Sequence, residues 1–451
     1  MLNLESKNIL ILGGGGSGIA AAKLACARKA IPTVLDTNAD AAERLARQLP
    51  PQARFLAGDE ALGWTGLCDW CVFSPGVPLD SPLAMAARRH TSRLISEHAF
   101  GGTFCQAPIL AVTGTNGKTT TTEMVAHLLN EGGRHAIAAG NIGLPLSEVA
   151  LQSPQPDVIV AETSSFQLEL PEHLHPRAAV LLNITPDHLE RHGSLQEYTR
   201  CKLAVFHNLP QGTSPVLNHK LLDLPAVSQA LERHHPAITF SATSDQATYT
   251  IRNGSLYNRP RQQELVAMEK LPFIGEHNYE NALAALALLE SAGLDSAALA
   301  PALTTFHTGP HRIETIAQFG AFTFVDDSKA TDVDAMMAAI RTIAPQGKPI
   351  ALIAGGIDKG CSLDEALPLL RAHVTHAALI GSCAERLASR WRDTLPVRIC
   401  ANLAEAVQNC LAALPDGGVV LLSPGCSSFD MFASYAARGE AFRTAVKNLF
   451  S

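Results

Sequence analysis

The chain has 451 residues, of which 47% are hydrophobic and 17% are charged, and its formal net charge is -7. This length suits about three domains of ~150 residues, and the composition is typical of a globular protein with large buried cores. The mildly acidic balance argues against general binding to nucleic acid or anionic membranes. The sequence contains neither a secretion signal nor an apolar run of membrane length, so we expect a cytoplasmic protein.

The chain opens with a strand, a glycine-rich loop at residues 13–18, an alanine-rich helix and a second strand that ends at Asp36. Gly13, Gly15 and Gly18 fit the pattern G-x-G-x-x-G, and Asp36 follows at the distance of a dinucleotide-binding fingerprint. The match is weak, because four consecutive glycines satisfy many patterns. The loop suits a nucleotide-diphosphate sugar as well as NAD, and a tight turn without a ligand is the third interpretation.

One C-x-x-C pair is present, formed by Cys68 and Cys71. No second pair accompanies it to complete a zinc site. The pair could be redox-active, but the surrounding CDWCVF favours a strand with small buried thiols.

The stretch ILAVTGTNGKTTTT at residues 109–122 is the strongest functional signal in the sequence. Its apolar start predicts a buried strand, Gly114 and Gly117 predict a turn, and the threonines open a helix. Backbone N–H groups and the helix dipole attract negative charge at such a turn. Lys118 can reach terminal phosphates and Thr119 can hold a metal ion, which predicts a phosphate-binding loop. The alternative is a plain glycine turn with an exposed lysine.

Short apolar runs alternate with helical patterns along the rest of the chain, which predicts an α/β fold with mainly parallel sheets. The runs expected to form strands are residues 70–73, 94–95, 158–161, 178–182, 322–325, 350–353, 377–380 and 419–422. Residues 216–272 are less regular and carry several turn signals. Ligands of parallel sheets bind at the carboxyl ends of the strands, and the polar motifs of this chain follow its apolar runs directly.

Four polar residues in the middle of the chain leave alternatives open. Glu162 follows a buried strand and could complete the Mg²⁺ shell of a bound nucleotide, or could be a solvated acid at a strand end. His188 and His192 are four apart and would share one face of a helix; they could bind zinc, although a third ligand is not evident, or face a second Mg²⁺. Lys202 lies in an apolar stretch, which favours a lysine that extends to solvent.

The last part of the chain carries further polar residues at turns. Asn278 and Asn281 stand at the start of a predicted helix, where capping is the stronger interpretation and adenine recognition the alternative. Lys329 and Lys359 follow strands, and cations so placed either bind a carboxylate or phosphoryl group or are surface charges. The polar turns lie at residues 309–314, 326–332, 355–360 and 423–430.

Three motifs together resemble the Mur ligase family of bacterial cell-wall synthesis: TGTNGKTTTT at 113–122, DSKAT at 327–331 and SSFDMF at 427–432. The first is shared with folylpolyglutamate synthase, and the other two resemble the glutamate-adding branch of the family. The resemblance covers essentially the whole chain. It implies a Rossmann-like UDP-binding domain at 1–98, a P-loop ATPase-like domain at 99–308 and a Rossmann-like domain for the incoming amino acid at 309–451. We expect a monomer.

The resemblance also implies roles for individual residues. ATP would be bound by Gly114, Thr115, Asn116, Gly117, Lys118, Thr119, Thr120, Asn278, Asn281, Arg312 and Asp327. The UDP-linked substrate would be bound by Gly15, Ser17, Asp36, Thr37, Ser74, Gly76, Asn141 and His188. The amino acid would be bound by Lys329, Thr331, Lys359, Ser428 and Phe429. Two Mg²⁺ ions would be bound by Thr119, Glu162, His188 and Lys202, the last carrying a carbamate derived from CO₂. The catalytic residues would be Lys118, His188, Lys202, Lys329 and Lys359.

The reaction implied by the resemblance is ATP-dependent addition of D-glutamate to UDP-N-acetylmuramoyl-L-alanine through an acyl phosphate, releasing ADP and phosphate. Asp332 stands where the family usually has Asn, and Gly425 and Ser427 replace alanines, which leaves the stereochemistry of the glutamate open. L-Glutamate is therefore one alternative, and a folylpolyglutamate-type ligase is another. From a different class, an NAD-dependent oxidoreductase is supported only by the first glycine loop.

Overall fold

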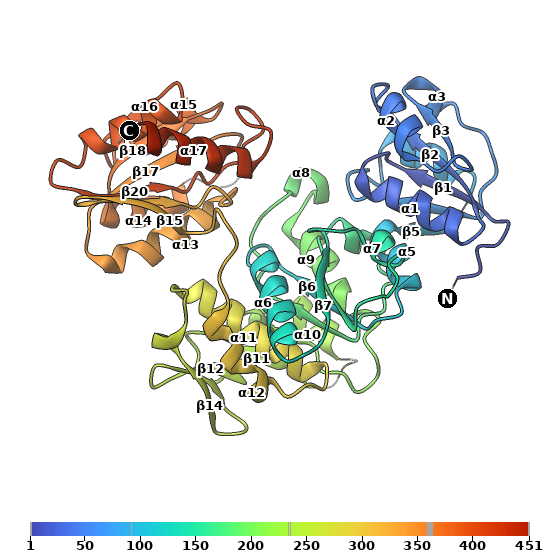
Figure 1. Cartoon of the computed structure of the whole chain (residues 1–451), viewed down its shortest axis with the longest axis horizontal. Coiled ribbons are helices and arrows are strands. Elements are labelled where there is room, and N and C mark those ends of the chain that lie inside the picture. The colour runs from blue at the N-terminus through green and yellow to red at the C-terminus, as the bar shows by residue number, and fades with distance from the viewer. Residues whose placement is uncertain (1, 92, 233, 235, 359–363, 450–451) are drawn as a thin grey trace. The chain divides into compact units, whose positions relative to one another are not determined.

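The computed structural model describes residues 2–91, 93–232, 234, 236–358 and 364–449, which form three sheets (Figure 1). The chain divides into two compact units. The first comprises Met1–Ile184, Glu190–Pro272 and Asn278–Phe306 and holds two sheets; the second comprises Thr185–Leu189, Phe273–His277 and His307–Ser451 and holds the third. The predicted α/β fold is confirmed, while the three domain boundaries stay predictions.

The N-terminal sheet has five parallel strands in the order β3-β2-β1-β4-β5. They are β1 (Asn8–Leu12), β2 (Ile31–Asp36), β3 (Arg54–Ala57), β4 (Trp70–Phe73) and β5 (Leu94–Ser96). The helices are α1 (Gly16–Ala27), α2 (Ala41–Gln48), α3 (Asp59–Leu62), α4 (Pro82–Arg88) and α5 (Glu97–Phe104). The strand order reverses between β1 and β4, and such a switch point opens a crevice at the carboxyl ends of the two strands.

The second sheet has nine strands in the order β14-β13-β12-β11-β10-β9-β6-β8-β7, parallel except for β12, β13 and β14. They are β6 (Ile109–Thr113), β7 (Ala136–Gly140), β8 (Val158–Glu162), β9 (Ala178–Leu181), β10 (Val216–Asn218), β11 (Ile238–Phe240), β12 (Tyr249–Arg252), β13 (Ser255–Asn258) and β14 (Gln263–Ala267). The α-helices of this stretch are α6 (Lys118–Glu131), α7 (Leu146–Val149), α8 (Leu189–His192), α9 (Leu195–Leu203), α10 (Pro225–Leu231), α11 (Glu276–Ser291) and α12 (Ser296–Leu299).

The stretch 216–272, expected to be irregular, contains five of these strands. β12 and β13 form a hairpin whose turn is Asn253 (φ 50°) and Gly254 (φ 73°). This left-handed pair is the tight turn that matches the twist of an antiparallel hairpin. The N-G turn signal was present in the sequence, but the flanking strands are too short to stand out by hydropathy.

The third sheet has six strands in the order β15-β16-β20-β17-β18-β19, with only β15 antiparallel. They are β15 (Glu314–Phe319), β16 (Phe322–Asp326), β17 (Ile350–Gly355), β18 (Val374–Ile380), β19 (Val397–Ile399) and β20 (Gly418–Leu422). The helices are α13 (Val333–Ile343), α14 (Leu367–His373), α15 (Ala384–Trp391), α16 (Leu403–Ala412) and α17 (Tyr435–Leu449). Alternate residues of the central strands belong to two apolar clusters, one packed with α13 and α15 and the other with α16 and α17.

The two sheets of the first unit share an apolar core. Helices α1 and α5 pack against α7, and the core joins Ile11 and Phe100 to Ala179 and Leu181 of the second sheet. Arg191 of α8 adds a polar link, because it donates to the carbonyl of Val77 at 3.2 Å. Within the described part of the chain, each helix is too short or too polar to cross a bilayer.

Candidate active site

The predicted phosphate loop joins the end of β6 to the start of α6. Gly117 is the N-cap of α6 and has φ 82°, and an added Cβ there would lie 2.3 Å from Oδ1 of Asn281. Gly114 is also left-handed, with φ 155°. Asn183 fixes the loop between them, since its Oδ1 accepts from the N–H of Asn116 at 2.8 Å and its Nδ2 donates to the carbonyl of Asn116 at 3.1 Å. The turn is therefore a pre-formed cradle at a helix N-terminus, the arrangement that attracts phosphate.

Two lysines meet at this cradle. The ammonium of Lys118 donates to the carbonyls of Gly114 at 3.0 Å and Thr115 at 2.6 Å. The ammonium of Lys202 donates to the same Gly114 carbonyl at 2.6 Å and lies 4.6 Å from the ring centroid of Tyr198. Lys202 is only 1% exposed, so the interpretation that it extends to solvent is wrong. The fold instead buries it against the phosphate loop.

Glu162 ends β8, the strand beside β6, and is 2% exposed. Its Oε1 accepts from Nδ2 of Asn141 at 2.8 Å, whereas its Oε2 is buried and meets no hydrogen-bond donor among the described residues. The interpretation as a solvated strand-end acid is therefore wrong. A buried carboxylate oxygen needs a compensating donor or cation, and Mg²⁺ prefers oxygen ligands, so the residues at this strand end fit a metal ion.

His188 and His192 do not share a helical face. His188 precedes α8 with φ 53°, and its ring lies 3.4 Å from the carboxylate of Asp187. His192 is buried and its Nε2 lies 3.0 Å from the hydroxyl of Ser165. Among the described residues no group of three or more His, Cys, Asp or Glu side chains is placed to hold a metal ion, so the zinc interpretation has no support.

Asn278 and Asn281 both lie inside α11, which begins at Glu276, so neither caps that helix and the capping interpretation is wrong. Asn281 is 6% exposed, and its Oδ1 accepts from the hydroxyl of Thr121 at 3.3 Å. This contact places Asn281 beside the first turn of α6, next to the predicted phosphate cradle. A role for either residue in ATP binding stays a prediction.

A cavity of about 610 Å³ opens at the switch point of the N-terminal sheet. Six of the eight residues expected to bind the UDP-linked substrate line it: Gly15, Ser17, Asp36, Thr37, Ser74 and Gly76. The other two, Asn141 and His188, are not among its lining residues. Asp36 shapes the wall, because its carboxylate accepts from the N–H groups of Gly14 at 2.7 Å and Asn38 at 2.9 Å.

The DSKAT motif of the second unit follows β16, and its Asp327 is buried. Ser423 donates to Oδ2 of Asp327 at 2.7 Å and the N–H of Ile313 donates to Oδ1 at 3.2 Å. Burial nevertheless raises the pKa of Asp327 to about 7. Lys329 holds its ammonium 5.1 Å from the ring centroid of Tyr435. Asp332 caps α13 by accepting from the N–H of Ala335 at 2.9 Å, a role in which Asn and Asp are equivalent.

The other residues expected to bind the amino acid lie near these motifs in the chain. Thr331 precedes α13, Ser428 is 2% exposed, and Phe429 is 72% exposed. Lys359 lies outside the described residues. The assignment of these residues together to an amino-acid-binding site therefore stays a prediction.

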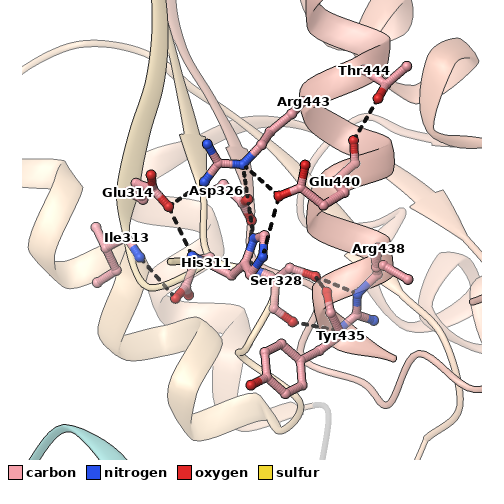
Figure 2. Close-up of polar contacts among 12 residues, drawn as sticks. His311, Ile313, Glu314, Asp326, Ser328, Tyr435, Arg438, Glu440, Arg443 and Thr444 are labelled. Carbon is pink, nitrogen blue, oxygen red and sulfur yellow. Dashed lines mark hydrogen bonds and ion pairs between the residues drawn. The ribbon is translucent and has the colours of Figure 1, made fainter. Parts of the chain in front are cut away.

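Arg438 was not singled out in the sequence, although it links the DSKAT motif to Cys426, the residue directly before the SSFDMF motif. It is 1% exposed and donates to the hydroxyl of Ser328 at 3.0 Å, the carbonyl of Ser328 at 2.7 Å and the carbonyl of Cys426 at 3.0 Å. Figure 2 shows Arg438 reaching Ser328 from α17. Its helical spacing with the apolar Phe442 and Val446 was the available signal, since it places an arginine on the buried face.

The C-x-x-C pair behaves as structural thiols. Cys71 is buried in β4, and burial raises the pKa of Cys68 to about 11 and that of Cys71 well above its usual value. A raised pKa leaves little reactive thiolate at neutral pH. The buried-strand interpretation is confirmed for Cys71, and the redox interpretation has no support.

A phosphate cradle on one sheet and a nucleotide-sized cavity on another define a nucleotide-binding protein built from several α/β sheets. Two family models match the chain: Mur ligase middle domain at residues 112–289 and Mur ligase, glutamate ligase domain at 311–426. The UDP-N-acetylmuramoylalanine--D-glutamate ligase of Dechloromonas aromatica is 38% identical over 467 residues, covering 100% of both chains. The enzyme of that name from Thermoanaerobacter sp. (strain X514) is 35% identical, covering 99% of this chain and 100% of its own. The chain therefore belongs to the Mur ligase family.

A solved relative shows the same fold. The MurF ligase of Thermotoga maritima in complex with ADP matches with a TM-score of 0.60 and 15% identity, covering 99% of this chain and 96% of that one. Membership of a ligase family overturns the alternative of an NAD-dependent oxidoreductase, which rested on the first glycine loop alone.

Proposed function

We propose that the chain is an ADP-forming ligase that joins D-glutamate to UDP-N-acetylmuramoyl-L-alanine in peptidoglycan precursor synthesis. The observation that carries the proposal is full-length identity of 35–38% to D-glutamate ligases. A buried lysine and a buried glutamate beside the phosphate loop support it, because amide synthesis with ATP requires phosphoryl transfer. The related MurF ligase was solved in complex with ADP, which supports use of ATP by this chain.

ATP would bind with its phosphates at the loop between β6 and α6. Lys118, which now donates to two backbone carbonyls, would turn its ammonium to the stronger phosphate acceptors. Two Mg²⁺ ions would be held by Thr119, Glu162, His188 and a carbamate on Lys202, and would neutralise phosphate charge. Fixed donors of this kind act on the charge that develops during transfer.

The reaction would proceed in two steps. The alanine carboxylate attacks the γ-phosphorus of ATP, the bond to the β–γ bridging oxygen breaks, and ADP leaves. The amine of glutamate then attacks the acyl carbon, phosphate leaves, and the amine loses a proton. Lys329, Thr331, Lys359, Ser428 and Phe429 would hold glutamate in position for the second attack, where orientation supplies much of the rate.

The UDP end of the substrate would occupy the cavity of the N-terminal sheet. Its glycine loop presents backbone N–H groups to a diphosphate, and Ser17, Asp36 and Thr37 offer hydrogen-bonding groups. The enzyme would act as a monomer in the cytoplasm, the compartment that supplies ATP and UDP-linked sugars.

The proposal is tested by phosphate release from ATP and Mg²⁺ in the presence of UDP-N-acetylmuramoyl-L-alanine with either D- or L-glutamate. We expect release with D-glutamate only, and only when the UDP-linked substrate is present. Release with L-glutamate alone would correct the stereochemistry. No release with either isomer would overturn the assignment, and release with a folate acceptor would favour the folylpolyglutamate-type alternative.

A further inference from the structure

The turn His311–Arg312–Ile313 is held in an unusual backbone conformation. His311 has φ 64° and Ile313 has φ 48°, so both neighbours of Arg312 are left-handed. This region is disfavoured for residues other than glycine, and a β-branched residue such as isoleucine is a marked outlier there. Such strain persists only where the surroundings over-determine the backbone, and it concentrates at functional sites.

Three backbone hydrogen bonds hold this turn. The N–H of His311 donates to Oε2 of Glu314 at 3.0 Å, and the carbonyl of His311 accepts from the N–H of Lys329 at 3.2 Å. The N–H of Ile313 donates to Oδ1 of Asp327 at 3.2 Å. The His311 ring adds a fourth contact, with Nδ1 2.7 Å from Oδ2 of the fully buried Asp326. Oε1 of Glu440 lies farther off, 3.8 Å from Nε2 of the same ring. The carboxylates that accept hydrogen bonds from His311 are therefore those of Glu314 and Asp326.

One guanidinium from α17 bridges these two carboxylates. Arg443 hydrogen-bonds to Oε2 of Glu314 through Nη2, and its Nε lies 3.6 Å from Oδ2 of Asp326. The same Nε lies 3.4 Å from Oε1 of Glu440, one turn earlier in α17. Figure 2 shows Arg443 above His311, between Glu314 and Asp326. Arg443 thus supplies the positive charge that keeps both acids in place around the turn.

Arg312, the central residue of the turn, has a guanidinium nitrogen whose hydrogen-bonding is not satisfied by the described residues. Nη2 of Arg312 is buried and meets no acceptor among the described residues. A buried guanidinium nitrogen without an acceptor is costly, and an anionic phosphate is the acceptor that a guanidinium fits best. The left-handed residues on both sides of Arg312 fix the backbone from which its side chain extends.

We propose that Arg443 and Glu314 are positioning residues that hold the strained turn and thereby orient Arg312 toward a phosphate of the bound nucleotide. The inference rests on the proposed function and on the ATP contact that the family resemblance implies for Arg312. Neither positioning residue touches the nucleotide itself.

The test is calorimetric titration of ATP with Mg²⁺ into the full chain and its variants, followed by the KM values of the ligase reaction. Arg443→Met is expected to weaken ATP binding about tenfold, while the KM for the UDP-linked substrate changes less than about twofold. Arg390→Met is the matched control, since Arg390 forms an exposed pair with Asp364 at 3.6 Å in the same unit; it should leave ATP binding unchanged. If Arg443→Met does not fold, Glu314→Gln, which keeps an acceptor for His311, is expected to weaken binding about threefold.

A second substitution separates positioning from general stability. Asparagine tolerates the left-handed conformation better than isoleucine, so Ile313→Asn should recover most of the ATP affinity lost in Arg443→Met. Failure of that rescue, or unchanged ATP affinity in Arg443→Met, would overturn the inference.

Arg312→Ala distinguishes this inference from the proposed function. Loss of ATP affinity in Arg312→Ala with full affinity in Arg443→Met would overturn the positioning role alone. Full ATP affinity in Arg312→Ala would overturn the nucleotide role of Arg312 and the inference with it.

Discussion

Two ammonium groups share the carbonyl oxygen of Gly114, one from Lys118 and one from Lys202. The two bonds, 3.0 and 2.6 Å long, place the two nitrogens at most 5.6 Å apart. Like charges within that separation repel by roughly 3 kcal/mol or more at an effective dielectric constant of ~20. A carbamate on Lys202 would replace this repulsion with attraction and would supply an anionic oxygen for Mg²⁺. The arrangement therefore gives a physical reason for the proposed modification.

Lys202→Ala is expected to lower the ligase rate by at least about 100-fold, because it removes a proposed metal ligand. Short-chain carboxylic acids should restore part of the rate if a carbamate is the true ligand. Lys23→Ala, on the exposed face of α1, is the matched control and should keep full activity. A Lys202→Ala enzyme that carboxylic acids never rescue would count against the carbamate.

Glu97 makes stability depend on pH. It is fully buried, and burial raises its pKa from 4.5 to about 7, although its Oε1 accepts from the N–H of Ser147 at 3.0 Å. At pH values between 4.5 and about 7, Glu97 keeps its proton in the folded protein but has released it in the unfolded chain. Rising pH therefore favours unfolding through this window, and the cost is complete above about pH 7.

Glu97→Gln removes the ionisation, so its stability relative to the wild type should increase by about 2 kcal/mol between pH 5 and pH 8. Urea unfolding at the two pH values measures this difference. Glu148→Gln, on an exposed position of α7, should show no such pH dependence. A relative stability of Glu97→Gln that does not change with pH would contradict the prediction.

The phosphate loop was predictable residue by residue because all its parts are local in sequence. Lys118 and Thr119 follow the turn directly. The environments of Glu162 and Lys202 were not predictable in this way, since their burial depends on strands and helices far apart in the chain. A sequence pattern gives only residue types and their spacing. It does not show which backbone carbonyl, far away in the chain, the ammonium of a lysine such as Lys202 will contact.

At the scale of elements, the fold requires glycine at some positions of the first glycine loop and not at others. A Cβ on Gly18 would lie 1.8 Å from the carbonyl oxygen of Gly13, a backbone atom that cannot move aside. A Cβ on Gly16 would meet no atom within 4 Å. The third glycine of G-x-G-x-x-G therefore serves close packing of α1 on the loop, independently of any ligand.

Gly18→Ala is expected to destabilise the chain by about 3 kcal/mol, because α1 must move away from the loop. Gly16→Ala, two residues earlier, should change stability by less than about 1 kcal/mol, and alanine favours the helix there. Thermal unfolding of the two variants side by side measures the contrast. Equal stability would show that the loop can relax around a methyl group.

Strand prediction succeeded where both faces of a strand are buried. β6, β8 and β9 read as continuous apolar runs and are buried along their whole length. β3 and β19 lie at sheet edges with mostly half-exposed or exposed residues, so they lack an apolar run. Interior strands can be predicted from hydropathy because both of their faces are apolar. An edge strand pairs with a neighbour on one side only and lacks that apolar run.

At the scale of the whole molecule, the first two sheets are not independent. Helices α1 and α5 bury apolar side chains against α7, so an isolated N-terminal fragment would expose that surface to water. Exposed contiguous apolar area of this kind promotes association or loss of structure.

We therefore expect a fragment of residues 1–104 to be unstable or to self-associate, and a fragment of residues 1–306 to unfold cooperatively. Circular dichroism melting and size-exclusion chromatography of the two fragments check this expectation. A monomeric 1–104 fragment that melts at the temperature of the full chain would contradict it.

The shared core also limits how such a chain can be re-engineered or can diversify. Because the helices of the N-terminal sheet are buried on the neighbouring sheet, the N-terminal sheet cannot be exchanged as an independent unit. An N-terminal sheet with a different acceptor specificity would fit this protein only if the surface of α7, including Ala150 and the residues around it, were redesigned at the same time. If the two sheets have the proposed roles, recognition of the acceptor and the phosphate chemistry are constrained to change together.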